Sequence, residues 1–271
     1  MRQPALFLGH GSPMTTITEC PERASWQALG RKLAGALRPS AILIVSAHWE
    51  TNGRVHVTAQ AAPPTIHDFR GFPPELFAVR YPAPGSAPLV ARLAELLGDA
   101  LVADDGWGFD HGSWGVMQPM FPDADIPMVQ LSLNRALDAN GDGTAHLALA
   151  RKLAVLRDEG VLIVGSGNIF HNLRLFFAHR EVLPQFSDPF VERILAAVAA
   201  GDDAALTRFA PDDEAAAVAI NSGEHYWPLI YTVGARLPGD GVAFFNRTGG
   251  DGLAMACVLL GDPSLVEGLT A

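Results

Sequence analysis

The sequence predicts an α/β fold: a single domain spanning residues 1–271, with a central mixed, largely parallel sheet flanked by helices on both faces. Two observations lead to this prediction. Short apolar runs rich in Val, Ile and Leu, bounded by Gly, Pro or polar residues, are typical of strands that are buried on both faces. These runs alternate with segments whose apolar residues recur every three or four positions, as on one face of a helix. Such alternation is typical of sheets that are at least partly parallel.

Seven apolar runs are expected to form strands. The clearest are ALFL at residues 5–8 and AILIVSA at residues 41–47, where almost every side chain is apolar. The remaining runs lie at residues 54–59, 126–132, 161–165, 242–246 and 253–260. No repeat of fixed period and no low-complexity linker separates them, so we expect one domain rather than two.

Helical periodicity is clearest between the first two strands. Four apolar residues recur there at intervals of three and four: Trp26, Leu29, Leu33 and Leu37. A second helix is expected from Ser86, because serine is a favoured N-cap and Pro88 falls in the first turn, where the missing amide hydrogen costs little. Further helices are expected at residues 144–158, 188–200 and 202–209. Residues 61–85, dense in proline and aromatic residues, are expected to form a long loop of the kind that often covers a functional site.

The composition argues against several classes of partner. The formal net charge is −10 and Lys and Arg form no cluster, so we expect no nucleic-acid binding. No run of ~18 uncharged apolar residues occurs, and the first apolar run is too short for a signal peptide, so we expect a cytoplasmic protein without a membrane span. The two cysteines, Cys20 and Cys257, form no CxxC motif, which argues against a disulfide framework or a zinc ribbon. The oligomeric state stays open, and a homo-oligomer is compatible with the sequence.

Histidines follow the buried strands at their carboxyl ends. His10 comes after ALFLG, His48 after AILIVSA, and His171 after a later buried run and a glycine-containing turn. Because ligands of open α/β sheets bind outside the carboxyl ends of the strands, we expect these imidazoles to share one edge, with His10 and His48 at adjacent strand ends. His225, next to Glu224 in SGEHYW, is a fourth candidate. Imidazole binds zinc, copper, iron or nickel, so the sequence predicts a metal site without choosing the metal.

The other five histidines are weaker candidates. His111 lies in DDGWGFDHGSWGVMQPM, a segment so rich in Gly and Trp that we expect a loop rather than a helix or strand. It either presents an imidazole to a site or has a structural role. His67, in the long loop, is a lesser candidate for substrate contact, and His56, His146 and His179 are expected to be structural.

Other catalytic motifs are incomplete. GHGSPM lacks the G-x-S-x-G pattern of a serine hydrolase, because His10 stands two positions before Ser12. No complete G-x-G-x-x-G, P-loop or HExxH motif occurs, so dinucleotide binding, P-loop chemistry and that class of zinc protease lack support.

Eight short motifs occur in order between the N-terminus and about residue 260: GHGSPM, SAHWE, DFRGFPPEL, YPAPG, DHGSWGVMQPMFP, IPMVQLSL, GSGNIFHNL and EHYWPLIY. Together they resemble the class III extradiol ring-cleavage dioxygenases, and among these the 4,5-DOPA dioxygenase-like branch. The resemblance implies a single α/β domain that opens an aromatic diol, such as a DOPA-like catechol, with O₂. It also implies one divalent metal, Fe(II) for dioxygenase activity or Zn²⁺ as bound.

The resemblance also implies roles for five histidines. Matched motif by motif, His10, His48 and His225 take the places of metal ligands. His171 takes the place of the active-site acid/base histidine, close enough to be counted with the metal, and His111 that of a second active-site histidine near the substrate and oxygen. One departure stands out: the protocatechuate-type branch has a carboxylate as third ligand, whereas His225 occupies that position here.

On this interpretation three protein ligands leave coordination positions for both oxygens of the diol and for O₂. His171 is expected to be a base with a pKa near neutrality that deprotonates the diol, and His111 the partner of the oxygen species. Phe69 and Phe72 are expected to close over the ring. Four aromatic residues beside the histidines are expected either to wall the site or to pack in the core: Trp49, Phe170, Tyr226 and Trp227.

Two other functions are compatible with the same residues. A zinc-dependent hydrolase could use the histidines to hold a metal-activated water. A non-enzymatic metal-binding or ligand-binding protein is the second alternative, because relatives such as the cell-motility mediator proteins share this fold and a fold does not determine a function. The sequence identifies neither the catechol nor the ring bond that is cleaved.

Overall fold

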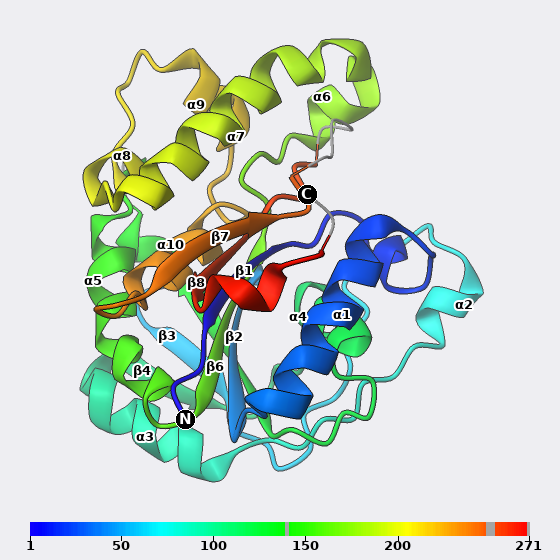
Figure 1. Ribbon diagram of the computed structural model, residues 1–271, viewed down its shortest axis with the longest axis vertical. Coiled ribbons are helices and arrows are strands. Elements are labelled where there is room, and N and C mark those ends of the chain that lie inside the picture. Colours follow the sequence, from blue (N-terminus) through cyan, green and yellow to red (C-terminus); the bar gives the residue numbers. More distant parts are fainter. Residues whose placement is uncertain (139–140, 248–252, 270–271) are drawn as a thin grey trace.

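The computed structural model describes residues 1–138, 141–247 and 253–269, and its strands form one mixed sheet of eight strands with helices on both faces (Figure 1). The order across the sheet is β4-β3-β5-β2-β6-β1-β8-β7. The strands are β1 (Ala5–Gly9), β2 (Ala41–Thr51), β3 (Val55–Thr58), β4 (Leu101–Asp104), β5 (Met128–Asn134), β6 (Val161–Gly167), β7 (Gly241–Phe245) and β8 (Cys257–Gly261). The predicted fold class, α/β with a largely parallel sheet, is confirmed.

The centre of the sheet is parallel. Strand β6 pairs in parallel with both β1 and β2, and β2 pairs in parallel with β5. The outer pairs β1–β8 and β3–β5 are antiparallel. The carboxyl ends of β1, β2 and β6 therefore meet at one edge, with Leu8 and Ser46 both in register with Ser166. The expectation of adjacent ends for His10 and His48 was wrong in one respect, because β6 lies between β1 and β2.

Side chains of successive strand residues enter two separate apolar clusters, because strand residues point alternately to opposite faces. In β1, Ala5 and Phe7 belong to one cluster and Leu6 and Leu8 to the other. The helices α1 and α4 cover one face, and α5 and α10 cover the other (Figure 1). Both faces of the central strands are therefore buried, as their continuous apolar runs predicted.

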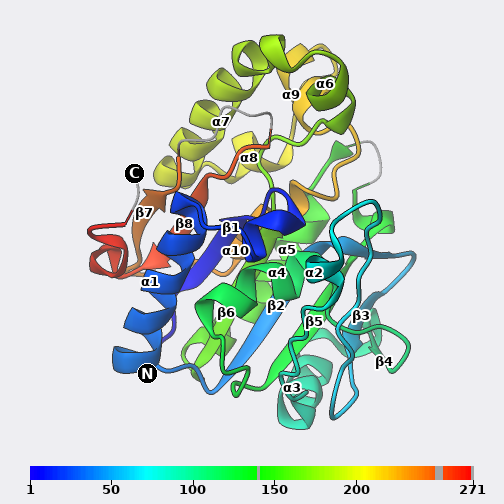
Figure 2. The same cartoon turned by 90° about the vertical axis from the view of Figure 1, so that its right-hand side faces the viewer.

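The helices that the structure describes are α1 (Pro21–Ala36), α2 (Pro74–Phe77), α3 (Ala87–Leu97), α4 (His111–Met120), α5 (Thr144–Leu153), α6 (Leu173–Ala178), α7 (Leu183–Ala200), α8 (Asp203–Thr207), α9 (Glu214–Ala219) and α10 (Trp227–Gly234). Helices α6, α7 and α9 lie together at one end of the molecule in both views (Figures 1 and 2). None of the helices in the described ranges is long and apolar enough to cross a bilayer.

Most predicted elements are present, with shifted ends. Ser86 is the N-cap of α3, and its hydroxyl accepts a hydrogen bond from the amide of Leu89 at 3.3 Å. The strand expected at residues 253–260 begins only at Cys257, and the helix expected at residues 188–200 begins at Leu183. The strand β4 and the helices α2, α4, α6 and α10 were not predicted, because all are short: each of these four helices has ten residues or fewer, with little periodic pattern.

Candidate active site

Five histidines from five segments surround one space at the carboxyl ends of the central strands. The ring centroids of His10 and His48 are 5.1 Å apart, and those of His48 and His111 are 3.9 Å apart. The ring of His225 lies 5.3 Å from that of His10, and His171 stacks on His225 at 3.4 Å. The structure thus brings together all five histidines that the sequence singled out.

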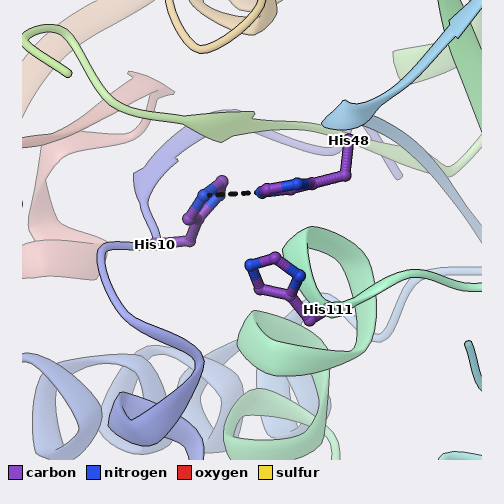
Figure 3. Close-up of side chains that lie close together, drawn as sticks. All are labelled: His10, His48 and His111. Atoms are coloured by element: carbon purple, nitrogen blue, oxygen red, sulfur yellow. Dashed lines mark hydrogen bonds between the residues drawn. The ribbon is translucent and has the colours of Figure 1, made fainter. Parts of the chain in front are cut away.

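We call His10, His48 and His111 the first histidine group. One ring nitrogen of each lies within 4.8 Å of the others, so the three could hold a single metal ion. Figure 3 shows the rings pointing toward one another from the loop after β1, from β2 and from the start of α4. The Nε2 atoms of His10 and His48 are 3.2 Å apart (Figure 3).

The second histidine group consists of His171, Glu224 and His225, whose ligand atoms also lie within 4.8 Å of one another. His171 lies in the turn after β6, and the other two precede α10. The ring of His225 is 5.0 Å from that of His48, so His225 connects the two groups.

The Nδ1 atoms of these rings face protein oxygens. His10 Nδ1 lies 3.0 Å from the hydroxyl of Ser166, which itself donates to the carbonyl of Gly112 and so accepts from the ring. His225 Nδ1 donates to the carboxylate of Glu224 at 3.0 Å. Because a carboxylate only accepts, the ring hydrogen is on Nδ1 and Nε2 keeps a free lone pair. Histidines that bind metals are commonly held in this way.

With the ring hydrogens on Nδ1, the spacing of the Nε2 atoms shows whether a metal ion fits between them. His48 Nδ1 lies 3.3 Å from the carboxylate of Asp68, and such an acceptor-only neighbour favours the tautomer with the hydrogen on Nδ1. Neither Nε2 in the 3.2 Å contact between His10 and His48 then carries a hydrogen, and two lone pairs face each other. A cation between them removes this repulsion. Tetrahedral zinc ligation separates two ligand nitrogens by about 3.3 Å, so the observed spacing fits one divalent metal.

Burial keeps the ligand imidazoles neutral. It holds the pKa of His10 well below the usual 6.5, and the neighbouring imidazole of His225 lowers it further. The pKa of His48 is well below 6.5 for the same reason, with His111 as the strongest neighbouring contribution. Since a metal binds the neutral form of imidazole, both rings have their lone pairs available at neutral pH.

The pKa values of His171 and Glu224, in the second histidine group, are also lowered. Burial, with a contribution from His225, lowers the pKa of His171 to about 3. Burial alone would raise the pKa of Glu224, but hydrogen bonds from His225 and Ser222 lower it to about 2. The expectation that His171 has a pKa near neutrality therefore does not match its surroundings. With this pKa the imidazole of His171 is neutral at physiological pH, and its protonated form gives up a proton readily.

The loop predicted around His111 was wrong: His111 is the first residue of α4, and Asp110 is its N-cap. The Asp110 carboxylate accepts from the amide of Ser113 at 3.1 Å and from the hydroxyl of Ser46 at 2.7 Å. Burial and the nearby charge of Asp68 raise the pKa of Asp110 to about 6.

Gly112 explains why a glycine-rich segment forms this helix. A Cβ atom at Gly112 would lie 2.3 Å from the Ser46 hydroxyl oxygen, so only glycine lets α4 approach β2 this closely. The close approach brings the ring of His111 to that of His48. Strand β2 also contains an irregularity, because its register with β5 shifts between Val45 and Glu50. Such irregularities re-aim side chains near active sites, and His48 lies within this one.

The histidines line a cavity of about 450 Å³. Its other lining residues are largely apolar and come from four segments: Gly11, Ser12 and Pro13; Phe69 and Phe72; Leu173, Phe176 and Phe177; and Leu253. Size alone does not identify the site, since a cavity of about 620 Å³ around Arg157 and Asp240 contains no histidine. The site is identified by the combination of converging imidazoles and apolar walls.

The remaining candidates divide clearly. Phe69 and Phe72 line the cavity as expected, whereas Trp49, Phe170, Tyr226 and Trp227 are buried in the core. His67 is not a lining residue, and its Nε2 lies 3.1 Å from the carbonyl of Val79. His56, His146 and His179 lie outside the cavity.

Three features of the site were not predicted from sequence. Asp68 and Ser166 hold the Nδ1 atoms of the histidines, and α6 supplies an apolar wall. The position of Asp68 in the long loop expected over a site was a weak signal for it. Nothing in the sequence pattern indicated Ser166, whose partner His10 lies 156 positions away in the chain.

Known proteins that are similar to this chain include aromatic ring-opening dioxygenases. The family model described as the catalytic LigB subunit of aromatic ring-opening dioxygenase matches residues 4–235. The 4,5-DOPA dioxygenase extradiol of Escherichia coli K12 is 47% identical over 241 residues, which cover 86% of this chain and 85% of that protein. The protein of the same name from Beta vulgaris is 41% identical over 169 residues, or 61% of each chain. The crystal structure of an uncharacterized protein from Escherichia coli K12 has a TM-score of 0.74 at 37% identity and covers 96% of this chain and 100% of that one.

Proposed function

The chain belongs to the LigB family of aromatic ring-opening dioxygenases and is an extradiol dioxygenase, and we propose that it opens a catechol in the histidine-lined cavity with one metal bound by His10, His48 and His225. Its substrates are an aromatic compound and O₂. The hydrolase and the non-enzymatic binding protein are not favoured, because the named relatives are dioxygenases.

One observation supports the metal site above the others: the facing Nε2 atoms of His10 and His48, 3.2 Å apart, each on a ring whose Nδ1 faces an oxygen. His225 adds a third imidazole whose Nδ1 is held by Glu224. An all-imidazole set accepts either Fe(II) or Zn²⁺. When bound, a divalent metal supplies Lewis acidity and open coordination positions for both diol oxygens and O₂.

His171 and His111 are proposed to handle protons. His171 lines the cavity as a neutral imidazole and is placed to accept a proton from a diol hydroxyl. Its low pKa makes it a weak base but an effective acid when it returns the proton to the opened product. His111, with Nδ1 hydrogen-bonded to Asp68 at 2.9 Å, keeps Nε2 free on the opposite side of the ring, where it faces the substrate and oxygen.

The apolar walls position the ring and exclude water. Phe69 and Phe72 lie on one side of the lining, and Leu173 and Phe176 come from α6. Aromatic side chains of this kind bind a planar ring in stacked or edge-on contacts. The names of the relatives point to DOPA, so a DOPA-like catechol is one proposed substrate. Among the described residues that line the cavity there is no Lys, Arg, Asp or Glu, so catechols with apolar substituents are proposed alongside it.

The direct test is reconstitution. The metal-free protein is loaded anaerobically with Fe(II) or with Zn²⁺, mixed with DOPA, unsubstituted catechol and alkyl-substituted catechols, and followed by O₂ consumption and the appearance of a yellow ring-opened product. We expect stoichiometric O₂ uptake with Fe(II) for at least one catechol and none with Zn²⁺. Absence of uptake for every catechol with the Fe(II) protein would overturn the proposal.

A further inference from the structure

We propose that Asp68 is a positioning residue that fixes the ring orientation and tautomer of His48 and His111 together. One carboxylate thereby links a metal ligand to the second active-site histidine. This inference rests on the function proposed above for the cavity.

The contacts of Asp68 reach both rings. Its Oδ1 accepts a hydrogen bond from the backbone amide of His111 at 2.9 Å, and its Oδ2 accepts one from His111 Nδ1, also at 2.9 Å. The same Oδ2 lies 3.3 Å from His48 Nδ1. The Asp68 side chain is only 15% exposed, so water competes weakly for these positions.

The chemistry of the carboxylate determines the tautomers. A neutral imidazole carries its hydrogen on either nitrogen, and an acceptor-only neighbour at Nδ1 selects the Nδ1–H form. Because Oδ2 faces both Nδ1 atoms, it selects that form in both rings and leaves both Nε2 lone pairs directed away from it. His48 then has the lone pair that a metal requires, and His111 has one facing the cavity.

The backbone around Asp68 is held against the start of α4. The amide of Ile66 donates to the carbonyl of Phe109 at 2.7 Å, and the amide of Phe109 donates to Pro64 at 2.8 Å. The indole of Trp114 donates to the carbonyl of Ile66 at 2.8 Å. These bonds join the loop before Asp68 to Phe109 and Trp114, which lie before and after His111 in the chain. The position of the Asp68 carboxylate is therefore fixed relative to His111.

The neighbouring carboxylates act differently. Glu224 holds His225, and Asp110 caps α4 without a hydrogen bond to a histidine in the described part of the chain. Asp104 offers a matched control outside the site: its Oδ2 lies 2.7 Å from His56 Nδ1, while its Oδ1 accepts from the amides of Gly106 and Trp107. Asp104 thus bonds a ring Nδ1 through Oδ2 and backbone amides through Oδ1, as Asp68 does, but it faces a single histidine, which does not line the cavity.

The test compares Asp68→Asn with Asp104→Asn. An amide of the same shape has one acceptor oxygen, so it cannot accept from the two rings and from the backbone amide of His111 together: in one orientation its NH2 group faces that backbone N–H, and in the other it faces both Nδ1 atoms. We expect Asp68→Asn to weaken Zn²⁺ binding about 10- to 100-fold in a chelator competition, and Asp104→Asn to leave it unchanged. In the metal-free protein, ¹⁵N–¹H spectra of the imidazoles should show the Nδ1–H form of His48 and His111, mixed with the Nε2–H form only in Asp68→Asn. For any catechol that is turned over, Asp68→Asn should lower kcat more than it raises KM.

Two further measurements keep the test decisive. Asp68→Glu retains the carboxylate and should recover part of the Zn²⁺ affinity that Asp68→Asn loses. If Asp68→Asn does not fold, the wild-type spectra decide, because Nε2–H tautomers at His48 or His111 would overturn the proposal. Unchanged Zn²⁺ affinity and tautomers in a folded Asp68→Asn would also overturn it. These readouts need no catechol, so they separate failure of this inference from failure of the proposed reaction.

Discussion

The two histidine groups face one cavity but rest on different supports. His48 lies in β2 and His10 directly follows β1, the two strands that flank β6 in the parallel centre of the sheet, and His111 begins a helix capped by Asp110. The second group lies in turns: His171 follows β6, and His225 precedes α10. Groups built on strands and helix ends are held more accurately than groups on loops. We therefore expect the tightest geometric demand, metal binding, to fall mainly on His10 and His48.

Backbone hydrogen bonds, besides the Glu224 carboxylate, support the second histidine group. The carbonyl of His225 accepts from the amide of Asn168 at 2.8 Å, and the amide of His171 donates to Ala219 at 3.2 Å. The adjacent helix α6 exposes apolar side chains, with Phe177 79% exposed. This side of the cavity therefore has fewer side-chain supports than the side formed by the first histidine group, and more of its apolar surface is exposed.

The largest expected effect comes from breaking the first histidine group at a strand. His48→Ala removes a nitrogen held between the sheet and Asp68, and should abolish both metal retention and ring opening. Metal content by elemental analysis and O₂ uptake measure the two properties. His56→Ala, in the next strand, is the control and should keep both. A His48→Ala protein that retains metal and activity would contradict the ligand assignment.

The next experiment asks which group supplies the third ligand. His225→Ala should lose the metal, whereas His111→Ala should keep it and lose turnover, because His111 is proposed to act on oxygen and substrate. Both proteins are compared by metal content after dialysis and by kcat. If instead His111→Ala loses the metal and His225→Ala keeps it, the ligands are the three members of the first histidine group.

A smaller effect is expected within the second histidine group. His171→Phe removes the proposed proton acceptor without removing a strand-borne ligand, so much of the metal should stay bound while kcat falls about 10²- to 10⁴-fold. Stopped-flow traces of substrate consumption measure the loss, with metal content determined on the same sample. An unchanged kcat would exclude the acid/base role of His171.

The smallest effect concerns pH and the support of His225. His146 stacks on Trp227 at 5.5 Å, and burial lowers its pKa to about 4 from the usual 6.5. Between these values the unfolded chain binds a proton that the folded chain does not, so stability falls as pH decreases from about 6.5 to about 4. The loss attributable to His146 is at most about 3.5 kcal/mol, at ~1.4 kcal/mol per pH unit.

Urea unfolding at pH 7 and pH 4.5 tests this. His146→Gln should lose less stability between the two pH values than the wild type does. The exposed His179 gives the control, because His179→Gln should follow the wild type. Equal pH dependence in all three proteins would show that His146 does not contribute.

The local sequence predicted the parts of the site that depend on strands. Continuous apolar runs identified β1, β2 and β6, and parallel topology placed His10, His48 and His171 at one edge. The local sequence did not predict the helix that begins at His111. That helix depends on the hydrogen bond between Asp110 and Ser46 and on the packing of Gly112 against β2. Periodicity does not record contacts between segments more than 60 residues apart.

By itself, the sequence determined the α/β class, the strands that carry His10 and His48, and the edge where the histidines gather, because these follow from the period of apolar residues and the direction of parallel strands. Only the tertiary structure decided how the rings face one another. The tautomers depend on Asp68, Ser166 and Glu224, and the first two reach their histidines across long sequence separations. The apolar wall likewise exists only once α6 lies over the strand ends.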